Sequence, residues 1–211
     1  MIFIDRNKEY IVEDYTFKNY VLLSEKEVRL VWEWRNHPDI RKWMANSDII
    51  PYESHLSFIN NLNSRKDAYY WLVLKNGNPI ATFNLTHIDY TKNSGMPGFY
   101  LSPDEIDSGE GFILHYYYKL LVFNQLGLEL LEGGFVKVGN VRAYLMGKFW
   151  GGNPVGYFEE DGEGYIEQRV SKVAFESVDK THLIKDFSAF ARKNRKIDWK
   201  EVISQVQSHN E

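Results

Sequence analysis

The stretch YYWLVLKNGNPIATFNLTHID, residues 69–89, decides the fold class because it holds two strand-like runs and the turn between them. Residues 70–74 and 80–88 are rich in β-branched and aromatic side chains, which favour strands. Between them, Asn76 and Gly77 supply the positive φ angles that a tight hairpin turn needs. The stretch therefore predicts an antiparallel hairpin.

Helices are expected on the N-terminal side of this hairpin. Ser24 and Glu27 have the spacing of a capping box and predict a helix over residues 25–34. His37-Pro38 should end it, because the residue before a proline is pushed out of the α region. The other expected elements on this side are one or two short strands or a hairpin in the first twenty residues, a short helix over 40–44 and a helix over 52–62.

Strands and helices mix on the C-terminal side. A helix over residues 112–126 should end at Gly127, where a left-handed residue favours glycine. The pattern predicts a mixed α/β fold with a mostly antiparallel sheet flanked by helices. The remaining expected elements are strands over 98–101 and 128–138, a helix over 140–149, a hairpin of 155–159 with 165–175, and a helical tail over 181–206.

Composition narrows the class of protein. The 211 residues include no cysteine, which excludes disulfides, thiolate catalysis and cysteine-ligated metals. A net charge of −4 supplies no overall field for nucleic acid or an anionic membrane. The N-terminal segment does not resemble a signal peptide, and no apolar run suits membrane insertion. We expect a cytoplasmic protein.

Two local features suggest binding chemistry. Ser108-Gly109-Glu110-Gly111 lies between a strand and a helix, where free backbone N–H groups suit a phosphate, although such glycines are often simple turn residues. The block WEWRNHPDIRKWM, residues 32–44, packs Arg35, Asn36 and His37 between aromatic rings. Arg35 either grips a phosphate or pairs with Glu33 or Asp39. The six histidines lack the spacing of metal ligands, so no metal is expected.

The order of these segments resembles the GNAT-superfamily N-acetyltransferases. The block at residues 32–44, the SHLSFINNL helix at 54–62, the hairpin at 69–89, GFYLSP at 98–103 and the Gly-x-Gly helix start come in the superfamily's order. The arginine-asparagine-histidine-proline block resembles a segment of one branch of the superfamily. The enzymes of this branch acetylate the 4-amino group of a UDP-linked amino sugar in pseudaminic acid biosynthesis. The resemblance covers residues 21–175 and implies a GNAT-like domain over residues 1–178, with residues 179–211 as a C-terminal helical extension packed on it.

The resemblance implies acetyl-CoA as co-substrate and a nucleotide-linked amino sugar as acceptor. Residues implied for acetyl-CoA are Phe99, Tyr100, Leu101, Ser108, Gly109, Glu110, Gly111 and Asn140. Residues implied for the acceptor are Arg35, Asn36, His37, Trp43, His55, Thr86 and again Tyr100. A homodimer is one state that the aromatic-rich hairpins allow.

Several positions depart from the superfamily pattern. The loop position that usually holds Arg or Gln is Ile106. The usual general acid, a tyrosine, falls on Gly147, and the branch's general base, a glutamate, falls on Phe135. Tyr144 and Glu132 are the nearby residues that a small shift would bring in as catalytic groups. The chain is therefore expected to be an acetyltransferase with vacant acid and base positions, or alternatively a GNAT-shaped module that binds a nucleotide sugar, acyl-CoA or a partner protein without turnover.

Overall fold

The computed structural model describes residues 1–208. Their contacts form two compact units that divide between Leu128 and Glu129. The boundary expected after residue 178 lies inside the second unit and stays a prediction. Residues 209–211 of the expected C-terminal extension, with His209, lie outside the described residues.

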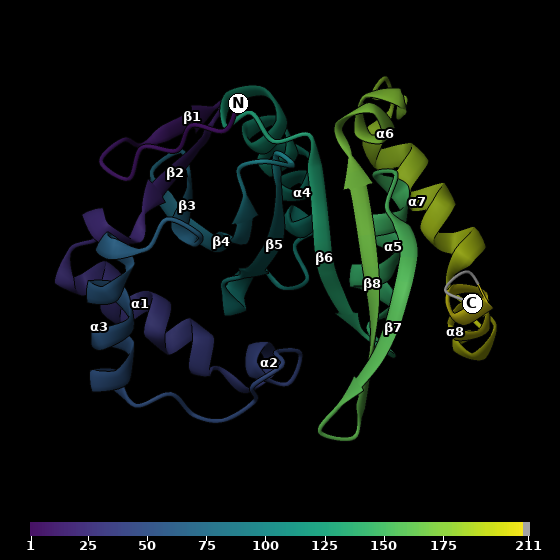
Figure 1. Ribbon diagram of the computed structural model, residues 1–211, viewed down its shortest axis with the longest axis horizontal. Coiled ribbons are helices and arrows are strands. Elements are labelled where there is room, and N and C mark those ends of the chain that lie inside the picture. The colour runs from purple at the N-terminus through teal and green to yellow at the C-terminus, as the bar shows by residue number, and fades with distance from the viewer. Residues whose placement is uncertain (209–211) are drawn as a thin grey trace. The chain divides into compact units, whose positions relative to one another are not determined.

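The first unit is built on five antiparallel strands in the order β1-β2-β3-β4-β5 (Figure 1). The predicted hairpin is confirmed, since β3 pairs with β4 and the turn residues Asn76 and Gly77 have φ angles of 48° and 80°. The strands expected in the first twenty residues are confirmed as the β1–β2 hairpin, although Ile2 and Ile4 belong to no strand. The strands are β1 (Tyr10–Val12), β2 (Tyr15–Asn19), β3 (Tyr69–Lys75), β4 (Asn78–Asp89) and β5 (Ser94–Leu101).

Three helices separate β2 from β3. The Ser24–Glu27 capping box starts α1 (Glu25–Asn36), as predicted. His37 ends α1 in an extended conformation, and Pro38 occupies the first turn of α2 (Pro38–Arg41). The third helix, α3 (Tyr52–Asn61), lies beside α1 (Figure 1).

The strand alternation gives this sheet two different faces. Leu72 and Tyr100 pack on the apolar cluster of α1 and α3. Phe83 and Phe99 stack instead on Tyr118 of α4 (Glu110–Leu120). Successive residues of a strand point to opposite faces, so neighbouring residues of β5 serve opposite sides of the sheet.

The helix predicted over residues 112–126 is confirmed in type, with a difference at each end. It starts two residues earlier, as α4, and continues as a π-helical segment, Leu121–Gln125. Gly127 follows with a φ of 79°, which is the left-handed conformation that its position after the helix requires.

The second unit contains three antiparallel strands in the order β6-β8-β7. Its core cluster joins Tyr144, Leu145 and Ile166 to apolar residues of the C-terminal helices. The elements are β6 (Leu130–Lys137), α5 (Val141–Phe149), β7 (Asn153–Glu160), β8 (Glu163–Ser171), α6 (Lys172–Ser177), α7 (Leu183–Asn194) and α8 (Trp199–Ser208).

One prediction for the second unit needs correction. Residues 172–175 were expected in a strand but form α6, because the Ser171 side chain accepts a hydrogen bond from the Ala174 N–H and caps a helix there. The helical tail expected over residues 181–206 is confirmed and consists of two helices, α7 and α8. At the break, Asp198 accepts hydrogen bonds from the backbone N–H groups of Lys200 and Glu201 and starts α8.

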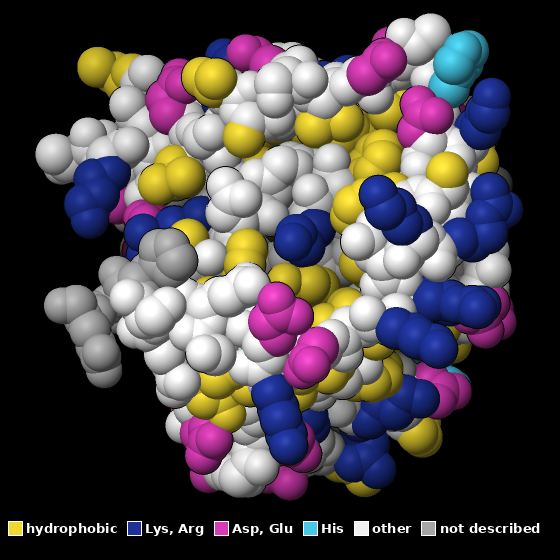
Figure 2. All heavy atoms as spheres, turned by 90° about the vertical axis from the view of Figure 1, so that its right-hand side faces the viewer, with side chains coloured by type: hydrophobic (Ala, Val, Ile, Leu, Met, Phe, Trp, Pro, Cys, Tyr) yellow, Lys and Arg dark blue, Asp and Glu magenta, His cyan; other side chains and the backbone are white. Residues whose placement is uncertain are grey.

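On the face shown in Figure 2, hydrophobic side chains appear singly or in small groups among charged side chains. No helix among residues 1–208 has the length and hydrophobicity to span a lipid bilayer.

Candidate functional site

The glycine loop before α4 has the geometry of an anion-binding helix start. Gly109 is the residue before the helix and has a φ of 87°, and a Cβ there would meet no atom within 4 Å. The Ser108 hydroxyl accepts a hydrogen bond from the Glu110 N–H at 3.0 Å. Since the first N–H groups of a helix lack intrahelical acceptors, this start favours a phosphate.

Glu110, which would repel a phosphate if it faced the loop, has other partners. Its carboxylate accepts hydrogen bonds from the Tyr15 hydroxyl and from the Lys75 ammonium, the latter at 2.8 Å. The hydrogen bond to Glu110 raises the pKa of Lys75. Lys75 of β3 thus compensates the charge of Glu110, and Tyr15 of β2 adds a hydrogen bond. The sequence alone did not indicate these contacts.

Gly111 serves a packing requirement. A Cβ at this position would lie 3.2 Å from Cδ1 of Leu101, at the end of β5. This close approach places the first turn of α4 directly on the strand. The two segments expected to bind acetyl-CoA, residues 99–101 and 108–111, therefore meet in one unit.

Arg35 is a half-buried cation without a carboxylate partner in the described part of the chain. Its Nη2 donates to the Asn46 carbonyl at 2.6 Å, while its buried Nη1 has no hydrogen-bond partner. Burial lowers the pKa of Arg35. The alternative pairing is not observed, because Asp39 pairs with Lys42 at 2.6 Å. A buried cation is expensive to leave unpaired, so this position suits an anionic ligand.

The neighbours of Arg35 fix the loop of residues 42–50. The Asn36 amide both donates to and accepts from the backbone of Ile50, at 3.0 and 2.8 Å, and Trp32 Nε1 donates to the same carbonyl. His37 Nδ1 accepts a hydrogen bond from the Asp39 N–H at the start of α2. Trp43, in the loop, keeps 43% of its surface exposed. The acceptor roles expected for Asn36, His37 and Trp43 stay predictions.

Tyr100 of β5 lies near Arg35, Thr82 and Tyr20. Its hydroxyl donates a hydrogen bond to the Val31 carbonyl at 3.4 Å, and burial raises the pKa of Tyr100. Thr82 lies opposite Tyr100 in the sheet. The sequence analysis did not identify Thr82 as a site residue, because nothing in its local pattern distinguishes it from other strand residues.

His55 and Thr86 are both buried, in different surroundings. His55 contacts Phe58, and its Nε2 has no hydrogen-bond partner. Burial lowers the pKa of His55 and favours the neutral ring. Thr86 contacts His87 near a bulge of β4, and within residues 1–208 no hydrogen bond joins it to Arg35 or His55. Arg35 and Tyr100 are therefore the expected acceptor residues that the structure brings together most directly.

In the second unit, the Gln168 side chain occupies the space where a side chain of residue 147, the position expected for the general acid, would begin. A Cβ at Gly147 would collide with the side-chain amide of Gln168, on β8. The buried Gln168 also donates from Nε2 to the Tyr144 carbonyl at 3.1 Å. Sequence reasoning missed Gln168, because its contact with α5 arises only from tertiary packing.

Tyr144 and Glu132, the two residues expected as catalytic groups, have different surroundings. The Tyr144 ring is buried and lies edge-on to Trp199 of α8, with centroids 5.2 Å apart. Glu132 lies half-buried on β6, just before Gly133 and the strand's irregular register. Phe135 is 48% exposed and contacts Phe158. The catalytic roles of Tyr144 and Glu132 stay predictions.

Asn140 has a structural role at the start of α5. Its side chain accepts a hydrogen bond from the Ala143 N–H at 3.1 Å and caps the helix. Its expected contact with acetyl-CoA is untested.

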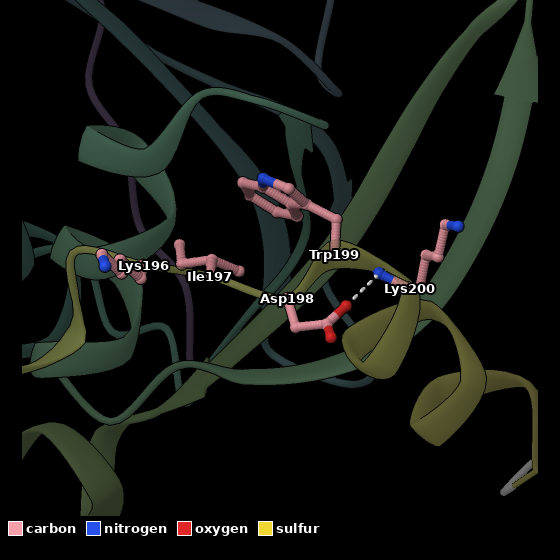
Figure 3. A pocket seen from close by; sticks show the side chains of 5 residues that line it. All are labelled: Lys196, Ile197, Asp198, Trp199 and Lys200. Atoms are coloured by element: carbon pink, nitrogen blue, oxygen red, sulfur yellow. Dashed lines mark hydrogen bonds between the residues drawn. The ribbon is translucent and has the colours of Figure 1, made fainter.

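One hollow lies apart from these residues. An open hollow of about 540 Å³ is lined by residues 196–200 at the connection between α7 and α8 (Figure 3). It contains none of the expected site residues. Among residues 1–208, no group of three or more His, Asp or Glu side chains is arranged to hold a metal ion.

Comparison with known proteins adds independent information. No profile of a known protein family matches the chain. The acetyltransferase PseH of Campylobacter jejuni is 32% identical over 148 residues, which cover 70% of this chain and 88% of that protein. The crystal structure of C. jejuni N-acetyltransferase PseH with acetyl coenzyme A matches with a TM-score of 0.58 and 22% identity, covering 75% of this chain and 99% of that one.

A second structural match is an N-acetyltransferase named for spermidine. Spermidine N-acetyltransferase from Vibrio cholerae, in complex with CoA and spermine, matches with a TM-score of 0.69 and 16% identity, covering 79% of this chain and all of that one. Both structural matches confirm the GNAT fold expected from the sequence. Together with the sequence identity to PseH, they establish that this chain belongs to the PseH-like N-acetyltransferases of the GNAT superfamily.

Proposed function

We propose that this protein transfers the acetyl group of acetyl-CoA to the amine of a nucleotide-linked amino sugar, of the UDP-4-amino-sugar type used in pseudaminic acid biosynthesis. The main support for this acceptor is the environment of Arg35. Its buried Nη1 has no partner, and a planar guanidinium binds phosphate oxygens in a bidentate way. A nucleotide diphosphate supplies the missing negative charge, whereas a polyamine acceptor would add positive charge.

For acetyl-CoA, we assign the pyrophosphate to the amides of residues 108–111 and the pantetheine arm to the backbone of residues 99–101. The support is the left-handed Gly109, the contact of Gly111 with Leu101, and the diversion of Glu110 to Lys75. These features keep the Glu110 carboxylate engaged elsewhere and leave the backbone of Gly109 open to an anion at the helix start.

The reaction requires a neutral amine, a polarised carbonyl and a proton for the departing sulfur. Positioning of the two substrates contributes up to about 7–11 kcal/mol, and general acid–base catalysis adds roughly 10²–10⁴-fold. We infer that the usual acid position is vacant, because Gln168 fills the space in front of Gly147. Phe135 likewise provides no base.

A second candidate function rests on those same two positions. Without an acid at Gly147 or a base at Phe135, the chain would be a module that binds acyl-CoA or a nucleotide sugar without turnover. The burial of Tyr144 against Trp199 also favours this alternative, because it withdraws the nearest tyrosine from solvent.

Calorimetric titration with acetyl-CoA, followed by a thiol-release assay, separates the two functions. The acceptor panel contains UDP- and dTDP-linked amino sugars together with spermidine. Thiol release with a nucleotide sugar, and none with spermidine, supports the proposed enzyme. Binding of acetyl-CoA without release for any acceptor supports the binding module.

A further inference from the structure

One face of α1 holds the end of the loop that follows α2. Trp32, Arg35 and Asn36 have the i, i+3, i+4 spacing that places side chains on the same side of a helix. All three donate hydrogen bonds to backbone carbonyls of residues 46–50. The proposed function assigns Arg35 to the acceptor and gives no role to the other two side chains.

The Asn36 amide is oriented by the backbone of a single residue. Its Nδ2 donates to the Ile50 carbonyl at 3.0 Å, and its Oδ1 accepts a hydrogen bond from the Ile50 N–H at 2.8 Å. Trp32 Nε1 donates to the same carbonyl at 2.7 Å. Ile50 is half-buried, so its backbone groups depend on these partners, because a buried N–H or carbonyl without a partner is costly.

The other end of this segment holds Arg35. Its Nη2 donates to the Asn46 carbonyl at 2.6 Å, and within residues 1–208 its side chain makes no other hydrogen bond. The Asn46 side chain turns the backbone here, since its Oδ1 accepts a hydrogen bond from the Asp48 N–H at 2.8 Å. The Asn46 carbonyl thus fixes one end of the guanidinium and leaves Nη1 without a partner.

A fixed Asn46 carbonyl lowers the cost of binding a ligand to Arg35. A long side chain such as arginine loses rotamer freedom when a ligand orders it, and this loss weakens binding. Asn46 lies four residues before Ile50. Without the hydrogen bonds at Ile50, the carbonyl that orders Arg35 ahead of the ligand would be free to move.

We propose, on the basis of the proposed function, that Asn36 is a positioning residue for the acceptor. Asn36 holds Ile50, the segment of residues 46–50 presents the Asn46 carbonyl, and this carbonyl orders Arg35 for a phosphate of the nucleotide sugar. Asn36 therefore acts through Arg35, not by touching the acceptor. Because such coupling is reciprocal, a bound nucleotide stabilises residues 46–50 in return.

Asn36→Leu removes both hydrogen bonds to Ile50 and keeps the branched shape of the side chain. We expect the KM for the nucleotide sugar to rise by about tenfold or more, with kcat at saturating sugar and acetyl-CoA affinity unchanged. A purely structural role would lower the melting temperature without this split between KM and kcat.

A double-mutant cycle with Arg35→Lys separates action through Arg35 from direct contact with the acceptor. If Asn36 acts through Arg35, Asn36→Leu raises KM much less in the Arg35→Lys background than in the wild type. Equal fold-increases in both backgrounds would show that Asn36 acts independently of Arg35 and would overturn the proposal.

Asn194→Leu is the matched control. Like Asn36, Asn194 is the half-buried last residue of a helix and donates from Nδ2 to a backbone carbonyl, that of Phe190 at 2.8 Å. It lies in the second unit and outside every assigned site. The KM of this variant should match that of the wild type.

Hydrogen–deuterium exchange of the wild type gives a readout that needs no turnover. The probe is UDP, whose binding is first measured by calorimetry. Saturating UDP should slow the exchange of the backbone amides of residues 46–50. Unchanged exchange with UDP bound would contradict the reciprocal coupling.

The outcomes separate the inference from the proposed function. If the wild type is active and folded Asn36→Leu retains its KM, the positioning role is wrong while the function stands. If Asn36→Leu fails to fold, Trp32→Phe decides by the same split, since it removes the other hydrogen bond to the Ile50 carbonyl and keeps a ring beside Tyr52.

The exchange experiment covers the remaining cases. A wild type that releases no thiol with any acceptor contradicts the proposed function, and the response of residues 46–50 to UDP then decides the inference. The same response decides if neither variant folds. A wild type that binds no UDP would contradict both.

Discussion

The side-chain amide of Gln168 lies where a Cβ of residue 147 would be, so Gly147 is the residue that fits between α5 and β8. Gln168 is held there by its hydrogen bond to the Tyr144 carbonyl. A side chain cannot be introduced at residue 147 without moving Gln168.

Gly147→Ala should lower the free energy of unfolding by about 1–3 kcal/mol, the usual cost of overpacking. In a Gln168→Ala background the same substitution should be nearly neutral, because the colliding atoms are gone. Urea denaturation of the four proteins gives the coupling energy. An equal cost in both backgrounds would show that Gln168 is not the obstacle.

Lys119 of α4 is fully buried, so Lys119→Met should change how stability depends on pH. Burial lowers the pKa of Lys119 in the folded state, so below the unfolded-state pKa of about 10.5 the unfolded chain binds a proton that the folded chain does not. The wild type should therefore gain stability relative to Lys119→Met as pH rises toward 10.5, by up to about 1.4 kcal/mol per pH unit. Urea denaturation at several pH values measures this, and parallel curves would contradict a neutral buried lysine.

Gly109→Asn should weaken acetyl-CoA binding by at least about tenfold while the protein stays folded. Asparagine tolerates a positive φ better than most residues, and its side chain would enter the open space above the helix start. The control is Gly77→Asn, since Gly77 also has a positive φ and open space but lies in the β3–β4 turn. Equal acetyl-CoA affinity for the two folded variants would remove the pyrophosphate from the loop.

Arg35→Lys should raise the KM for the nucleotide sugar by about tenfold or more and leave acetyl-CoA affinity unchanged, because lysine lacks the planar fork. Arg41→Lys is the control: Arg41 also donates to a carbonyl of the same loop, that of Ser47 at 2.8 Å, but its side chain is not in the unpartnered, buried position of Arg35. A loss of stability in Arg35→Lys with an unchanged KM would make Arg35 a structural residue.

Tyr144→Phe tests the general acid expected from the sequence. Because the ring packs on Trp199, we expect kcat to change by no more than a few-fold and acetyl-CoA affinity to be unchanged. A fall in kcat of about 10²-fold would identify Tyr144 as the general acid.

Much of the fold could be predicted because its signals are local. The Asn76-Gly77 turn, the Ser24–Glu27 capping box and the left-handed Gly127 each act within a few residues. The strand expected over residues 172–175 failed for a local reason too, since the Ser171 cap outweighed the apolar pattern.

The site was less predictable because its decisive contacts are long-range. The partners of Glu110, Tyr15 and Lys75, are 95 and 35 residues away in sequence. Gln168 reaches Tyr144 across 24 residues. His115 and Lys119 are four residues apart on one helix, but both side chains are buried by tertiary packing, which the sequence does not display.

The most direct test of the central claim is mass spectrometry of a UDP-4-amino sugar incubated with acetyl-CoA and the protein, alongside measurement of free CoA thiol. The account predicts that the sugar gains one acetyl group on its amine, in equal amount to the thiol released, and that Arg35→Lys slows both at subsaturating sugar. Unmodified sugar at saturating acetyl-CoA, with acetyl-CoA bound to the protein, would contradict it.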